Sequence, residues 1–144
     1  MFFKQIFLVF LAILLFTGCS NTSPELSASP YSGHEKYDVN ILHYSLDPDT
    51  SKIQFEVCNR AGSAISYGTK WYLETIRENQ WYTVDFLSGK PLAWPDVLLH
   101  LNADVQTEIE IPLSGYYVTP LSAGQYRLVQ PVGQKILCFE FEIE

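Results

Sequence analysis

Short runs in which apolar and polar residues alternate dominate the chain from about residue 39 to residue 144. In the run 137–143, for example, Leu, Phe, Phe and Ile alternate with Cys, Glu and Glu. This period of two places successive side chains on opposite faces of a β-strand, so it predicts strands with one buried face. No segment of this region has the 3.6-residue period of an amphipathic helix. The predicted strands are 39–46, 53–58, 71–76, 81–86, 105–112, 125–130 and 135–143.

About seven short strands at this spacing predict an all-β fold, an antiparallel β-sandwich. In the run 53–58, the odd-numbered residues are predicted to face the core and the even-numbered ones, including Cys58, to face outward. The run 39–46 is less regular, because its apolar residues fall on both faces of a regular strand. Val39 and Ile41 lie on one face, and Leu42, Tyr44 and Leu46 lie on the other.

Glycine and proline mark the breaks between these strands. Gly68 precedes the strand 71–76 and predicts a bulge or bend. Residues 87–100 contain Pro91 and Pro95 and have no regular period, so they predict a long loop that crosses between strands.

The segment 121–127, with the sequence Leu-Ser-Ala-Gly-Gln-Tyr-Arg, leads into a predicted strand. Gly124 can adopt backbone angles that other residues avoid, which suits a sharp entry into the strand. Tyr126 is predicted to be buried, with its hydroxyl group bonded to nearby backbone as in the tyrosine corner of immunoglobulin sandwiches. Arg127 alternates to the outward face, where it could pair with a carboxylate on an adjacent strand.

This segment and several aromatic positions together resemble a bacterial immunoglobulin-like domain family that is common in envelope lipoproteins of Gram-positive bacteria. The resemblance covers nearly all of residues 39–144 and implies an immunoglobulin-like β-sandwich. It implies no catalytic residue, because the fold alone does not specify an activity. The positions that carry it are Asn59, Tyr67, Gly68, 71–74, Trp81, 102–111 and 121–129.

The first eighteen residues have the pattern of a signal peptide, predicted to be helical. Lys4 precedes an apolar segment, 6–16, which is too short for a transmembrane helix of about 20 residues. The sequence Leu-Phe-Thr-Gly-Cys that ends at Cys19 resembles the lipobox of bacterial lipoproteins, in which the cysteine carries the lipid. This resemblance implies acyl chains such as palmitate on Cys19. The alternatives are a plain signal peptide with a chance cysteine and an uncleaved membrane anchor.

The predicted organisation therefore has three parts: a signal peptide (1–18), a lipidated cysteine with a flexible tether (19–38) and the sandwich domain (39–144). Residues 20–38 are rich in Ser, Pro and Gly and have no run able to form a core. A flexible coil of about 19 residues reaches roughly 24 Å, so the domain is predicted to lie near the membrane but free of it.

Charge limits the partners. The net charge of −7 becomes −8 when the signal peptide is removed, because Lys4 is its only charged residue. An acidic domain repels phosphate backbones and anionic lipid headgroups, so nucleic acid is excluded and only the lipid anchor is predicted to contact the membrane. Basic and neutral partners remain open.

No arrangement of residues predicts catalysis, a cofactor or a metal site. His34, His43 and His100 lack the local spacing of metal ligands, and no nucleophile elbow is present. Cys58 and Cys138 form an even pair in a compartment that permits disulfides, although both fall on outward faces. The sequence therefore leaves a disulfide between them open.

Surface aromatic residues are the best candidates for binding. Trp94, Trp81, Tyr116 and Tyr117 are predicted to contribute, since exposed rings stack on sugars and anchor protein partners. The leading hypothesis is a lipid-anchored lipoprotein on the extracytoplasmic face of the cell membrane, whose domain is a non-catalytic binding or structural module for an unidentified envelope protein or glycan.

Two alternatives differ in how the domain acts. A protease inhibitor would present the end loops 91–96 or 115–120 to an enzyme. A cell-wall glycan binder would use the surface aromatic residues.

Overall fold

The computed structural model describes residues 26–89 and 91–144, which form ten strands and no helix. Within these residues, no helix is long and apolar enough to span a membrane. The predicted signal peptide, Cys19 and the tether up to residue 25 lie outside the described residues. The strands are β1 (Ser27–Ala28), β2 (Val39–Leu46), β3 (Lys52–Asn59), β4 (Ile65–Tyr67), β5 (Tyr72–Arg77), β6 (Gln80–Thr83), β7 (Leu99–Leu101), β8 (Gln106–Pro112), β9 (Gly124–Val132) and β10 (Lys135–Ile143).

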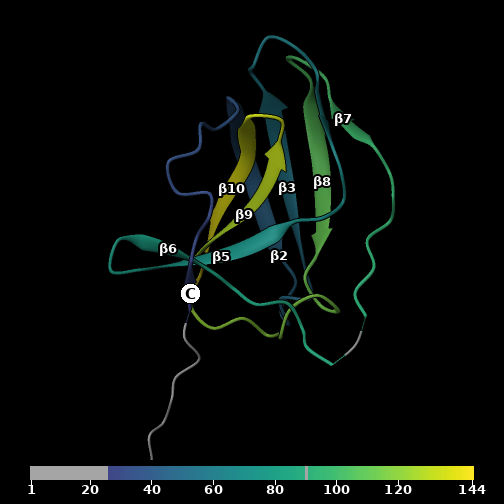
Figure 1. Cartoon of the computed structure of the whole chain (residues 1–144). Coiled ribbons are helices and arrows are strands. Elements are labelled where there is room, and N and C mark those ends of the chain that lie inside the picture. Colours follow the sequence, from purple (N-terminus) through teal and green to yellow (C-terminus); the bar gives the residue numbers. More distant parts are fainter. Residues whose placement is uncertain (1–25, 90) are drawn as a thin grey trace, which may run out of the picture.

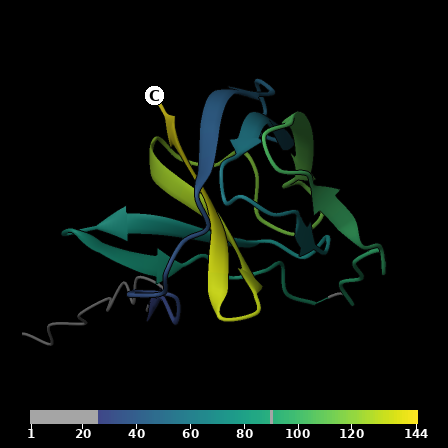
Figure 2. The same ribbon diagram turned by 90° about the horizontal axis from the view of Figure 1, so that it is seen from above.

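The strands form two main layers and a small ribbon (Figure 1). One layer is a five-stranded sheet in the order β1-β6-β5-β9-β10, and the other is a three-stranded sheet in the order β2-β3-β8. The ribbon pairs β4 with β7. All strand pairs are antiparallel, and the hairpin of β5 and β6 extends beyond the sandwich (Figure 2). The predicted antiparallel β-sandwich is therefore confirmed.

The core lies between the two layers and is rich in aromatic rings. Ile53, Phe55 and Val57 of β3 are completely buried, as their alternation predicts. Phe55 lies 5.1 Å from Phe139 of β10, and Trp71 lies at the same distance from Phe139 (ring centroids). Burial of such side chains contributes roughly 1.5–3 kcal/mol each.

A β-bulge explains the irregular pattern of β2. The register with β3 shifts between Ile41 and His43, so Leu42 is the extra residue. The bulge brings Val39 and Ile41 to the same core face as Tyr44 and Leu46, whereas Leu42 is 51% exposed. The prediction of apolar residues on both faces of one regular strand was wrong for this reason.

The structure has three short strands that the sequence did not predict: β1, β4 and β7. Each has two or three residues, too few for a period of two to be recognised. The bend expected near Gly68 is present, because the chain turns there from the ribbon (β4) into the five-stranded sheet (β5). The predicted crossing loop is also present, but it ends at residue 98, where β7 begins.

The structure differs from the predicted tether in residues 27–38. We name residues 26–38 the N-terminal strap, which in Figure 1 runs beside β10. The β1 strand within it pairs with β6, and the Tyr37 amide donates to the Ile136 carbonyl (2.9 Å). The strap resembles a coil in sequence because it has few apolar residues. It folds because its backbone groups bond to β6 and β10 and because the rings of Tyr31 and Tyr37 pack against the domain.

Beneath the strap lies a buried ion pair. The Arg127 Nε donates to Glu74 Oε2 at 2.6 Å across β9 and β5, where the two residues are directly paired. The Ser29 hydroxyl of the strap donates to the other Glu74 oxygen at 2.5 Å. Arg127 thus pairs with a carboxylate on the adjacent strand, as expected, but the strap buries both partners.

The other two positions of the 121–127 segment also have their expected conformations. Gly124 has a φ of 152°, and the Tyr126 hydroxyl donates to the Ser122 carbonyl at 2.9 Å. Tyr126 is 8% exposed. The segment therefore forms a tyrosine corner that fixes the entry into β9.

Candidate functional site

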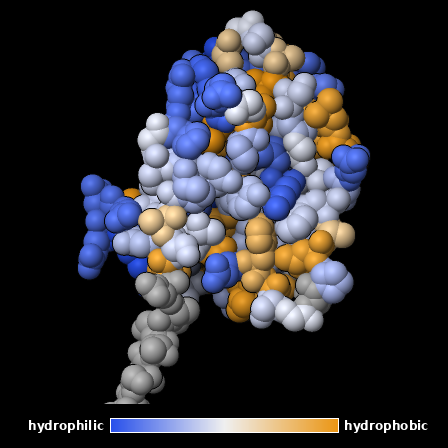
Figure 3. Space-filling view, in the orientation of Figure 1, coloured by the Kyte–Doolittle hydropathy of each residue, from blue (hydrophilic) through white to orange (hydrophobic). Residues whose placement is uncertain are grey.

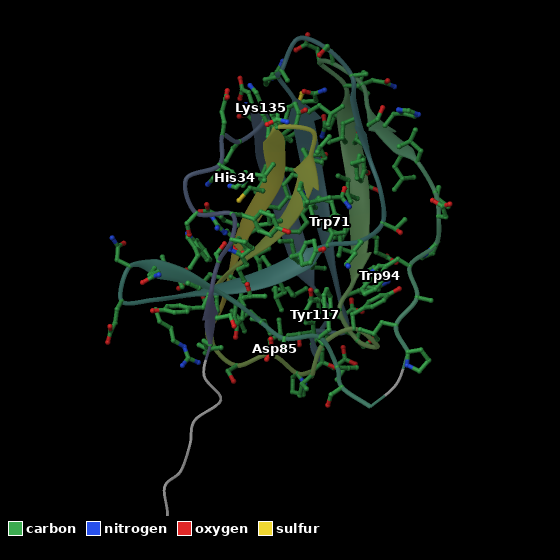
Figure 4. The ribbon with its side chains drawn as sticks, in the orientation of Figure 1. His34, Trp71, Asp85, Trp94, Tyr117 and Lys135 are labelled. Atoms are coloured by element: carbon green, nitrogen blue, oxygen red, sulfur yellow. The ribbon has the colours of Figure 1, made fainter. Side chains whose placement is uncertain are left out.

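Trp94 lies in the crossing loop and packs against the end of the sandwich. Its ring is stacked on Tyr116 (5.1 Å between centroids, 13° between planes) and meets Phe86 edge-on at 5.2 Å. Figure 4 shows Trp94 and Tyr117 toward the same end of the molecule, away from His34 and Lys135. Two of the four aromatic residues predicted to bind, Trp94 and Tyr116, are thus brought together.

Hydrogen bonds hold the Trp94 loop on both sides of the ring. The Tyr116 hydroxyl donates to the Ala93 carbonyl at 3.0 Å, and the Thr69 hydroxyl donates to the Pro95 carbonyl at 2.6 Å. The backbone is therefore fixed immediately before and after Trp94. A ring held in this way loses little further conformational freedom when it contacts a ligand.

Lys70 lies beside the same rings. Its ammonium nitrogen is 4.7 Å from the Trp94 centroid, 5.1 Å from Tyr72 and 5.7 Å from Phe86. These distances are within the range of cation–π attraction. The backbone of Lys70 is also held, because the buried Gln130 amide donates to its carbonyl at 2.7 Å.

Lys70 and Trp94 line an open groove of about 520 Å³. One carboxylate, that of Asp96, also lines it. Beside the groove, the loop continues into exposed apolar residues, with Leu98 65% exposed, and Figure 3 shows hydrophobic residues on the edge of the molecule where β7 lies. The groove is lined by Gly68, Thr69, Lys70, Tyr72, Trp94, Pro95, Asp96, Val97, Gln130 and Pro131.

The other two predicted binding residues have structural positions. Tyr117 is 3% exposed, and its hydroxyl accepts from the Leu73 amide and donates to the Trp71 carbonyl, both at 2.9 Å. Burial raises the pKa of the Tyr117 hydroxyl. Trp81 is half-buried and lies over the Arg127 guanidinium at 4.4 Å, so it covers the buried ion pair. Neither residue lines the Trp94 groove.

Sequence analysis did not identify Lys70 as a site residue. One signal was available: Lys70 and Tyr72 are two positions apart on either side of the core residue Trp71, so alternation places them on the same face. Their proximity to Trp94 could not be predicted, because it depends on the path of a loop with no regular period.

The cysteines and histidines are spread over separate elements. Cys58 in β3 and Cys138 in β10 are free thiols, and burial raises the pKa of the Cys138 thiol. Although Cys58 was predicted on an outward face, it is buried. Among residues 26–89 and 91–144, no group of three His, Cys, Asp or Glu side chains could hold a metal ion.

One exposed pair has a spacing seen in nucleophilic catalysis. Ser66 Oγ lies 2.9 Å from His100 Nδ1 across the ribbon of β4 and β7. A catalytic nucleophile also needs a group that orients the histidine. No hydrogen bond of the described residues joins a carboxylate to His100, so this pair lacks the third member of a triad.

A family model described as a bacterial Ig-like domain matches residues 33–143. The chain belongs to this family. The match begins within the N-terminal strap, so the bacterial Ig-like domain includes residues that the sequence assigned to a tether. Its fold agrees with a non-catalytic binding or structural module.

Other comparisons add little. No curated protein matches this Ig-like domain chain. A solved chain of the archaellum periplasmic stator protein complex FlaF and FlaG from Sulfolobus acidocaldarius is similar to it, with a TM-score of 0.42 and 15% identity over 81% of this chain and 99% of that chain. At this distance we take no function from the likeness.

Proposed function

We propose that the chain is an extracytoplasmic lipoprotein, anchored through Cys19, whose Ig-like domain is a non-catalytic module that binds a glycan of the cell envelope. The observation that carries the binding role is the position of Trp94, half-buried and fixed at the wall of an open groove. Aromatic faces of this kind contribute large contact areas at low cost in conformational entropy.

The geometry favours glycan binding over protease inhibition. An inhibitory loop has to project its side chains into an enzyme cleft. Here Trp94 of the loop 91–96 packs back against Tyr116 and Phe86, and Tyr117 of the loop 115–120 is buried. Both loops use their largest side chains to stabilise the sandwich and the groove.

Lipid anchoring through Cys19 would limit how far the strap can lie from the membrane. Leu26 is seven residues from Cys19, and an extended chain spans at most about 3.6 Å per residue. Since the strap is bound to the sheet, residues 26–38 do not add to the reach of the predicted tether. A lipidated Cys19 would hold the start of the strap within about 25 Å of the membrane surface.

Fractionation of cells that express the full chain tests the anchor. The wild-type protein is expected in the membrane fraction, and Cys19→Ala is expected to be released or to remain unprocessed. Ser20→Ala is the matched control and should stay in the membrane fraction, because it leaves the thiol in place. Membrane retention of Cys19→Ala in a processed form would refute lipidation at this residue.

Retention on purified cell walls tests the binding role. Trp94→Ala is expected to weaken retention about fivefold, since an aromatic contact of this kind contributes about 1 kcal/mol. Tyr82→Ala removes another half-buried ring outside the groove and should not change retention. Wild-type protein that is not retained, or equal retention of Trp94→Ala, would refute glycan binding through the groove.

A further inference from the structure

We propose that the groove selects a saccharide that bears a carboxylate, which binds the Lys70 ammonium while a sugar ring lies against the Trp94 wall. This inference rests on the proposed glycan binding and specifies its ligand class.

Lys70 differs from the other lysines of the described residues. Each of the other three forms an ion pair with a glutamate: Lys36 with Glu140 (2.7 Å), Lys52 with Glu110 (3.0 Å) and Lys135 with Glu35 (2.5 Å). None of the ion pairs among the described residues includes Lys70. In a chain with 16 acidic and nine basic side chains, an ammonium group without a carboxylate partner is notable.

Aromatic rings and a buried amide hold Lys70 instead. The faces of Tyr72, Phe86 and Trp94 attract the ammonium without neutralising its charge. The buried Gln130 amide fixes the backbone, since it bonds to both Gly68 and Lys70. The ammonium therefore lies in the groove with its hydrogen-bond donors available. It is a preorganised hydrogen-bond donor for an anion. Arg77 also lacks an ion pair, but it lies over no described aromatic ring.

The rest of the groove limits which anion fits. Asp96 lines the same groove and forms no ion pair with Lys70. A carboxylate can accept hydrogen bonds from sugar hydroxyl groups, but it repels a polyanion that has no such groups, such as polyphosphate. The net charge of −7 adds to this repulsion. A sugar ring with one carboxylate offers an anion to Lys70, hydroxyl groups to Asp96 and apolar C–H groups to the part of the Trp94 ring that Tyr116 and Lys70 leave uncovered.

Binding of the full chain in non-ionic detergent to immobilised polygalacturonate, dextran and polyphosphate tests this ligand class. Polygalacturonate is expected to retain the wild-type protein better than either of the other polymers. Lys70→Met should weaken this retention about tenfold, the size expected for the loss of a charge-assisted hydrogen bond. Lys70→Arg should restore most of it. Added salt should weaken retention of the wild type, because the contact is ionic.

Lys135→Met is the matched control, since Lys135 also lies over an aromatic ring (Tyr37, 5.8 Å) but is outside the groove and paired with Glu35. Equal retention of wild type and Lys70→Met, or wild-type binding to dextran or polyphosphate as strong as to polygalacturonate, would overturn the proposal. If Lys70→Met still binds purified cell walls like the wild type, the ligand class is wrong and glycan binding stands. If the wild type does not bind cell walls, glycan binding itself fails.

Discussion

The buried ion pair between Glu74 and Arg127 is the residue-scale feature that ties the strap to the sheet. Both side chains are almost completely buried, at 0% and 4% exposure. Ser29 and Trp81 complete the cluster, because the Ser29 hydroxyl bonds to Glu74 and the Trp81 ring covers the guanidinium. Both carboxylate oxygens of Glu74 thereby accept a hydrogen bond, and no buried side-chain polar atom of the described residues lacks a partner.

Substitution of one charged member of this cluster should lower the free energy of unfolding. Arg127→Met leaves the Glu74 carboxylate buried without its counter-charge, so the free energy of unfolding should fall by about 3–5 kcal/mol. Chemical denaturation monitored by tryptophan fluorescence measures this change. Glu74→Leu combined with Arg127→Met should recover most of the loss, because no uncompensated charge is left. A single variant as stable as wild type would show that the pair is not buried in solution.

Tyr117 predicts a loss of stability at high pH. Burial raises the pKa of Tyr117, and burial together with the neighbouring Tyr72 raises the pKa of Tyr31 to about 12, from an ordinary value of 10.0. A raised pKa means that the folded state holds the proton more tightly than the unfolded state. The Tyr31 contribution is complete below pH 10 and is lost as the pH rises from 10 through 12, and the Tyr117 contribution is likewise present below pH 10 and is lost above it.

The variant Tyr117→Phe separates the hydrogen bonding of the Tyr117 hydroxyl from its ionisation at high pH. At pH 8 it should be less stable by about 1–3 kcal/mol, because the buried Leu73 amide loses its acceptor. Between pH 8 and pH 11, its unfolding free energy should fall less steeply than that of the wild type. Denaturation curves at both pH values provide the comparison, and parallel slopes would contradict the assigned burial of the phenol.

At the scale of elements, the strap is the part of the domain whose amino-acid composition did not predict that it folds. Its backbone bonds to β6 and β10, and it covers the face of the five-stranded sheet that carries Arg127. Val129 and Ile136 are completely buried on this sheet, although alternation places Val129 on the outer face with Arg127.

Deletion of the strap, residues 26–38, from the full chain should therefore destabilise the domain. Loss of cover from Val129 and Ile136 alone should lower the unfolding free energy by about 3 kcal/mol, at roughly 1.5 kcal/mol or more for each side chain. Thermal unfolding followed by circular dichroism measures the effect. Ser27→Ala, at an exposed position of β1, serves as the control and should change stability by less than about 0.5 kcal/mol. Unchanged unfolding of the deleted chain would restore the prediction of a tether up to residue 38.

The strands show where sequence analysis succeeds and where it fails. The predicted bounds of β2 and β10 agree with the structure to the residue. In β10, apolar and polar side chains alternate without a break from residue 137 to residue 143, which is the pattern that predicts a strand. Strands of two or three residues give too few alternations, and the strap gives none. Its position depends on pairing with β6 and β10, which are far away in sequence.

The candidate site likewise contains one residue that the sequence predicted and others that it did not. Trp94 was predicted as a binding candidate, and the structure places it in the wall of the groove. Tyr117 was assigned to the surface because a turn sequence does not reveal that the chain folds its ring beneath β5. Lys70 was missed because its importance comes from three rings on separate segments, which only the folded chain brings together.

At the scale of the whole molecule, the strap and the groove both lie against the five-stranded sheet. The strap passes from Leu26 over the five-stranded sheet, and the groove lies at the junction of the crossing loop with β5 and β9. A chain of aromatic contacts runs from the strap to the groove, through Tyr31, Tyr72, Phe86 and Trp94, with neighbouring ring centroids 5.2–5.8 Å apart. The strap and the groove wall are thus parts of one packed layer.

Fluorine NMR of the full chain labelled with 5-fluorotryptophan tests whether the Trp94 groove is the binding surface. The chain has three tryptophans, which lie in the core (Trp71), over the ion pair (Trp81) and in the groove (Trp94). Enzymatically solubilised cell-wall fragments are titrated into the labelled protein, and Trp94→Phe assigns the resonance. We expect a saturable shift of the Trp94 signal, with the Trp71 and Trp81 signals unchanged. A saturable shift confined to Trp81, or no shift at any fragment concentration, would contradict it.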